Sequence, residues 1–122
     1  MKIMNLKEAF NSVENYFSPK IIGEVNDQFI KVAKIKGQDL PWHNHENEDE
    51  LFYIVEGKLL MEIENEPKFT MEKGDLFVVK KGVIHRVSST EDCLIMLIES
   101  KTTEHTGKVI SKITKSIEEQ TY

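Results

Sequence analysis

Turn residues divide the chain from residue 21 onward into short segments with the composition of β-strands. Strands are expected over 21–25, 28–37, 58–64, 68–72, 75–80, 84–89 and 93–100. Turns are expected at 26–27, 56–57, 64–67, 73–74, 81–82 and 89–92. Many short strands with no helix between them predict an all-β chain, folded as an antiparallel sandwich or barrel.

A helix is expected before the strands, because apolar residues recur at helical spacing over residues 6–17. Asn5 and Glu8 resemble a capping box at its start, and Pro19 disfavours helical geometry at Ser18 and so ends it. The apolar stripe needs a partner surface, so the helix is either a packed cover or an oligomer element. The stripe consists of Leu6, Ala9, Phe10, Val13 and Phe17.

The 122 residues predict one domain over 1–122, with a helical N-terminal segment over 1–20 and a C-terminal extension over 101–122. The end of the extension, SKITKSIEEQTY, reads either as a strand with a frayed polar end or as a short helix. His105, within the extension, is interpreted as a surface loop residue. No apolar stretch is long enough for a signal peptide or a membrane span, so a cytoplasmic protein is expected.

Charge and cysteine content exclude several functions. The net charge is −5, and the basic residues form no patch and no helix-turn-helix pattern, which argues against nucleic-acid binding. Cys93 is the only cysteine, so no internal disulfide is possible. Because Cys93 lies in the apolar run CLIMLIES, we interpret it as a buried structural thiol rather than a nucleophile.

The stretch PWHNHENEDELFYIVEG, residues 41–57, carries the candidate chemistry. In an extended chain, His43 and His45 point to the same side about 7 Å apart, and Glu50 shares a face with the apolar residues that follow it. An antiparallel sheet can bring His85 beside them, although the sequence does not show the pairing. Imidazoles and a carboxylate suit borderline divalent metals. The other reading is a solvated acidic loop at 46–49.

Two spaced motifs resemble those of the cupin superfamily. Gly37, five residues, His43-x-His45, four residues, Glu50, six residues and Gly57 match the first cupin motif in every position. The second motif is Gly, five residues, Pro-x-Gly, two residues, His, three residues, Asn. Gly74, Gly82 and His85 fit it, whereas Lys80 replaces the proline and Ser89 replaces the asparagine. Sixteen residues separate Gly57 from Gly74, and the resemblance covers residues 37–89.

The resemblance implies a small antiparallel β-barrel of jelly-roll type, in which His43, His45, Glu50 and His85 hold one divalent metal. Iron, manganese, nickel, zinc and copper all occur in the family. Asp49 is an alternative to Glu50, because the family tolerates three or four intervening residues. Trp42, out of phase with the histidines, is expected outside the sheet or at a dimer contact.

What the resemblance implies about function is less specific. It implies either a metal-dependent enzyme, such as an oxygenase or isomerase acting on a small polar organic molecule, or a non-catalytic binding or sensing module. Glu50 is the first candidate for an acid or base, and a homodimer is the expected assembly.

Overall fold

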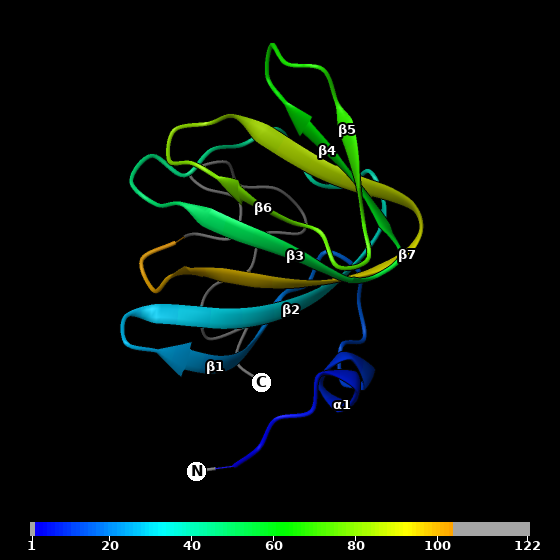
Figure 1. The fold of residues 1–122 in the computed structure, drawn as a ribbon, viewed down its shortest axis with the longest axis vertical. Helices are drawn as coiled ribbons and strands as arrows, with labels where there is room; N and C mark the ends of the chain where they lie inside the picture. The colour runs from blue at the N-terminus through cyan, green and yellow to red at the C-terminus, as the bar shows by residue number, and fades with distance from the viewer. Residues whose placement is uncertain (1, 104–122) are drawn as a thin grey trace.

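Residues 2–103 are described by a computed structural model, and they form a small antiparallel β-barrel of jelly-roll type preceded by a short helix (Figure 1). The helix is α1 (Leu6–Asn11), and the strands are β1 (Lys20–Val25), β2 (Gln28–Gly37), β3 (Glu50–Glu56), β4 (Lys58–Ile63), β5 (Phe69–Glu72), β6 (Leu76–Val79) and β7 (His85–Ser100). The all-β architecture expected from the turn spacing is therefore confirmed. The C-terminal extension beyond residue 103, including His105, lies outside the described residues.

The strands form two sheets that share β7 (Figure 1). The larger sheet has the order β1-β2-β7-β3-β6, and the smaller one consists of β5, β4 and the first residues of β7. All of the strand pairs are antiparallel. The chain passes from one sheet to the other within β7, as strands do at the corners of jelly-roll barrels.

β7 corrects one expectation, because the turn predicted at 89–92 does not exist. Residues 85–89 and 93–100, from the two strands expected at 84–89 and 93–100, lie in one strand of 16 residues, His85–Ser100. The polar residues at 89–92 instead form a bulge: Ile35 pairs with Cys93, while Gly37 pairs with Ser89. Extra residues on one strand bend it and increase its twist, so turn-like composition here marks a bend between sheets.

The helix is also shorter than predicted. It begins at the Asn5 cap, whose side chain accepts a hydrogen bond from the Glu8 N–H at 3.1 Å, and it ends at Asn11 rather than at residue 17. Phe17 has a φ of 54° and donates its N–H to the Lys34 carbonyl at 2.8 Å. This left-handed conformation is costly for an aromatic residue and is held by the surrounding packing.

Because the helix ends at Asn11, the apolar residues of the predicted stripe belong to two separate hydrophobic clusters. Phe10 and Val13 pack with Val32 on the outer face of the larger sheet, as the predicted cover requires. Phe17 belongs instead to the core inside the barrel. A continuous helix presents one stripe to one surface, so it could not supply both.

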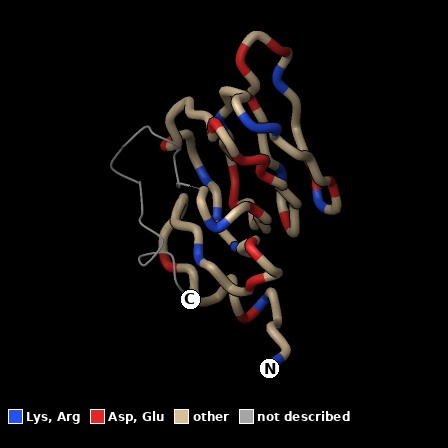
Figure 2. Tube along the Cα trace, turned by 90° about the vertical axis from the view of Figure 1, so that its left-hand side faces the viewer, with Lys and Arg blue, Asp and Glu red and all other residues tan. Residues whose placement is uncertain are grey.

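Side chains alternate between the inside and the outside of the barrel along each strand. Glu50, Phe52 and Ile54 are all buried, as the parity of β3 predicted. Lys and Arg are scattered among Asp and Glu along the described chain, again as predicted (Figure 2). No helix in the described part of the chain has the length and apolarity needed to cross a bilayer.

Cys93 is expected to be unreactive in the folded protein. Its side chain is fully buried, and burial raises the pKa of its thiol to about 11. At pH 8 only about one thiol in a thousand is then the reactive thiolate. We expect Ellman's reagent to label less than a tenth of the native protein in an hour and all of it at once in denaturant. Rapid labelling of the native protein would contradict this burial.

Candidate metal centre

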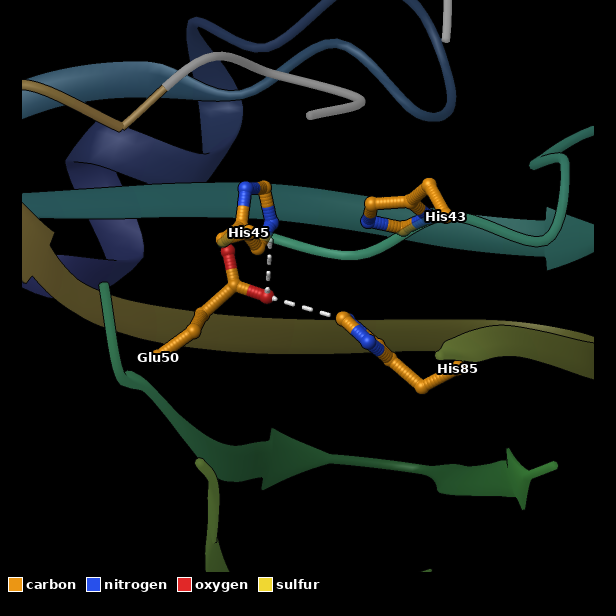
Figure 3. Close-up of side chains that lie close together, drawn as sticks. All are labelled: His43, His45, Glu50 and His85. Carbon is orange, nitrogen blue, oxygen red and sulfur yellow. Dashed lines mark ion pairs between the residues drawn. The ribbon is translucent and has the colours of Figure 1, made fainter. Parts of the chain in front are cut away.

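The four predicted ligands converge inside the barrel (Figure 3). Glu50 is the first residue of β3, and His85 is the first residue of β7. His43 lies before β3, where its main chain pairs with that of His85 through hydrogen bonds of 2.9 and 3.1 Å. The His45 carbonyl accepts a hydrogen bond from the Gly82 N–H at 2.8 Å. Backbone pairing thus supplies the contact between the two motifs that the sequence left open.

The geometry of the four side chains fits one ion. Each offers a ligand atom, and these atoms lie within 4.8 Å of one another. Glu50 Oε1 is 3.7 Å from His45 Nε2 and 3.4 Å from His85 Nε2, the two contacts drawn in Figure 3. All four residues are at most 5% exposed. A divalent cation between them would meet three imidazoles and one carboxylate, which is a donor set that borderline metals accept.

Hydrogen bonds fix two of the three rings with a nitrogen available at the centre. His43 Nδ1 donates to the Pro41 carbonyl, and His85 Nδ1 donates to the Val83 carbonyl, each at 3.0 Å. A neutral imidazole that donates through Nδ1 carries its lone pair on Nε2. This arrangement orients histidine ligands in many metal sites.

Buried ring nitrogens that make no hydrogen bond also support a metal site. His85 Nε2 and both ring nitrogens of His45 are buried and make no hydrogen bond in the described structure. An unsatisfied buried polar atom is costly, and native proteins seldom leave several together. The residues therefore fit a divalent metal, which would satisfy at least two of these atoms.

The pKa values of these groups reflect the same burial. Burial lowers the pKa of His45 and of His85 below that of an ordinary imidazole. Burial also raises the pKa of Glu50, against the opposing effects of a hydrogen bond with Glu99 and the charge of Lys31. Neutral imidazoles are the form that binds metal, and a cation would reverse the penalty on the ionised carboxylate.

Sequence reasoning missed a buried ion pair behind Glu50. Glu99 of β7 lies directly opposite Glu50 of β3 in the strand register. Lys31 Nζ of β2 lies 2.5 Å from Glu99 Oε1, and the two side chains are 1% and 3% exposed. Burial and the adjacent Glu50 carboxyl raise the pKa of Glu99 well above its usual value, against the charge of Lys31. The sequence did contain a signal for this pair: Lys31 and Glu99 alternate in phase with the inward-facing residues of β2 and β7.

The remaining sequence candidates lie outside the cluster. Asp49, the alternative to Glu50, accepts hydrogen bonds from Lys80 Nζ and from the Lys81 N–H, both at 2.9 Å. Lys80, which replaces the motif's proline, thus ties the turn before His85 to the acidic loop. Ser89, which replaces the asparagine, has its Oγ 2.7 Å from the carbonyl of Lys58. Neither departure changes the four residues of the cluster, and both side chains make hydrogen bonds elsewhere.

Trp42 lies on the outer side, as predicted. Its side chain is 39% exposed, and the guanidinium of Arg86 stacks 4.4 Å from the ring centroid. The ring therefore makes a cation–π contact at the surface instead of lining the barrel.

A partly open cavity adjoins the cluster. The centre of a water molecule can occupy a volume of about 40 Å³ inside it. The polar residues that line it are His43, Glu50 and Glu99. The rest of its lining is apolar and includes Phe17 and Pro19 from the N-terminal segment. A small molecule in this cavity would reach the His43 and Glu50 side of the cluster.

The protein is thus a small antiparallel barrel with three imidazoles and one carboxylate buried together in its interior. These features define a candidate metal-binding protein. A family model described as the cupin domain matches residues 32–99, which is more than half of the chain. The chain therefore belongs to the cupin family, as the two motifs indicated.

Individual relatives agree with this assignment. The uncharacterised protein YdbB of Bacillus subtilis (strain 168) is 31% identical over 103 residues, or 84% of this chain and 90% of that protein. A cupin-2 domain containing protein from Shewanella frigidimarina NCIMB 400 is 34% identical, covers 80% of this chain and 94% of its own, and has a TM-score of 0.76. KdgF from Halomonas sp. is 28% identical over 68% of this chain and 78% of its own, with a TM-score of 0.60.

Proposed function

We propose that the protein binds one divalent transition metal through His43, His45, Glu50 and His85. The observation that carries this proposal is the set of buried imidazole nitrogens that make no hydrogen bond and lie around one carboxylate. Iron, manganese, nickel, zinc and copper all accept such donors, and the choice among them depends on availability as much as on affinity.

Metal analysis of the purified protein tests the site. We expect close to one equivalent of metal per chain in the wild type, and a loss of at least tenfold in His43→Ala, His85→Ala and Glu50→Gln. Asp49→Asn is the matched control, because Asp49 carries the neighbouring carboxylate but is held by Lys80 outside the cluster. A wild type that cannot be loaded with any of the five metals would contradict the proposal. Metal loss in the control alone would move the ligand to Asp49.

We further propose a metal-dependent enzyme acting on a small polar organic molecule, in the class of oxygenases, isomerases and related activities. A divalent metal would supply Lewis-acid polarisation of a substrate oxygen at this site. The chain itself contributes a partly open, largely apolar cavity that places a ligand beside His43 and Glu50. Glu50 is our candidate for moving a proton, because it is the cluster's carboxyl and also lines the cavity.

The alternative is a non-catalytic binding or sensing module, for which the same cavity and cluster suffice. A ligand screen followed by product analysis separates the two. A binder is stabilised by a compound that it leaves unchanged, whereas an enzyme converts it. The expected homodimer and the expected cytoplasmic location rest on the chain's composition and its family, and both remain expectations.

A further inference from the structure

The cavity beside the cluster has a pronounced internal asymmetry. Its polar lining side chains are His43, Glu50 and Glu99, all of which belong to the cluster or touch it. The other lining residues are apolar, among them Phe17, Leu40, Phe52, Val87, Ile95 and Leu97. A molecule in the cavity therefore meets polar groups at one end and hydrocarbon along the rest of its length.

The main chain does not restore polarity to the apolar walls. Ala33 pairs with Ile95 in the β2–β7 ladder, and Phe52 pairs with Leu97 in the β3–β7 ladder. Hydrogen bonds within these ladders use the backbone groups of the walls. A hydroxyl group carried past the polar end would lose its water without gaining a partner, which disfavours binding.

The net charge around the cluster determines which ligand head group the polar end of the cavity favours. The ammonium of Lys31 contacts Glu99, and Glu99 shares a hydrogen bond with Glu50. A divalent metal carries twice the charge of its single carboxylate ligand, so the metal, Glu50, Glu99 and Lys31 together keep a net positive charge whether or not Glu99 is ionised. Such a site favours an anionic ligand head, since a charge is stabilised in the interior when it is paired.

We infer that the site takes a small anionic, oxygen-chelating ligand whose tail is a short unsubstituted hydrocarbon, and that it rejects polyhydroxylated molecules such as sugar acids. This inference rests on the metal site proposed above and adds the chemical class of its ligand. The head lies toward His43 and Glu50, and the tail lies among the apolar side chains that close the cavity.

Alkyl hydroxamates of increasing length are suitable probes, because they chelate metals as monoanions through two oxygens. Acetohydroxamic, butanohydroxamic and hexanohydroxamic acids are titrated calorimetrically into the zinc-loaded protein. We expect Kd to fall about fourfold for each methylene until the cavity is full, which corresponds to about 0.8 kcal/mol per buried methylene. Gluconohydroxamic acid, with a hydroxylated six-carbon chain, should bind no more tightly than acetohydroxamic acid.

Two variants locate the tail. Leu40→Ala shortens a half-buried wall residue, and it should shift the best chain length upward by one or two carbons without changing zinc content. Leu51→Ala is the matched control, because Leu51 follows Glu50 and points out of phase with it. The control should leave the chain-length series unchanged.

The outcomes separate the ligand class from the metal site. Equal affinity at all chain lengths, or tighter binding of the gluconic compound by zinc-loaded protein, overturns the ligand class and leaves the metal site standing. If the protein takes up no metal, the proposed function fails. A preference of the metal-free protein for the hexano over the glucono compound would then support the apolar tail, and its absence would overturn it.

Discussion

Replacing Lys31 with methionine is expected to lower the free energy of unfolding of the metal-free protein by about 3 to 5 kcal/mol at pH 8. Methionine has a similar length and volume, so the substitution chiefly removes the ammonium group. Glu50 and Glu99 would then lie side by side in the barrel interior without the cation that Glu99 now contacts. Urea unfolding in the presence of a chelator measures the change.

The loss should be smaller at pH 5 than at pH 8, and the sign follows from the carboxyl pKa values. Burial and the adjacent Glu50 raise the pKa of Glu99 in the folded chain, and removal of Lys31 raises it further. A carboxyl with a raised folded-state pKa contributes its full stability only below its unfolded pKa. That stability is lost as the pH rises through the folded-state pKa.

Two variants make this experiment specific. Lys36→Met removes an exposed lysine from the same strand and should cost little. Lys31→Met combined with Glu99→Gln removes both members of the pair and should recover part of the loss. An unchanged stability in Lys31→Met at pH 8 would show that the ammonium does not compensate the buried carboxylates.

Gly57→Ala is expected to be the second severe substitution, with a loss of about 2 to 5 kcal/mol. Gly57 has a φ of 85°, a conformation that side chains rarely adopt. An added Cβ would also lie 2.4 Å from the Asp92 carbonyl oxygen and 3.0 Å from Cys93 Cα. Both are backbone atoms of β7, which a rotamer change cannot move aside. The urea midpoint of the variant measures the effect.

Gly74→Ala is the matched control for this prediction. Gly74 has a φ of 91°, and a Cβ at this position would meet no atom within 4 Å. Its loss should therefore be only the conformational cost of about 1 to 2 kcal/mol. Equal losses in the two variants would contradict the prediction. They would mean that the backbone of β7 shifts at its bulge and that the contact between the added Cβ and β7 costs no stability.

The parts of the fold that were predictable from sequence are those governed by local patterns. β2 occupies the range expected for it, because a polar turn precedes it and Gly37 is its last residue. The parity of β3 placed Glu50 and Phe52 on one inward face for the same reason. Strand phase placed His43 and His45 on one side, and the expectation that Glu50 and His85 join them came from the resemblance of the two motifs to those of the cupin superfamily.

The features that were missed depend on tertiary structure. Residues 89–92 have turn-like composition, and only the pairing of β7 with β2 and β4 shows that they bend a strand without reversing it. Phe17 lies beyond the end of the helix and packs inside the barrel, although its spacing continues the apolar stripe of the helix. Lys31 and Glu99 were passed over because a lysine or glutamate in a strand is ordinarily solvated, although their phase pointed inward.

β7 links the order of assembly to the chemistry of the molecule. It contributes His85 at its first residue and Glu99 near its last, and between them it pairs with β2, β3 and β4. Its partners are distant in sequence, and contacts of this kind form late and slowly. The cluster therefore exists only after both sheets have closed on one strand. The time course of metal uptake by a refolding chain would therefore report the rate at which the barrel closes.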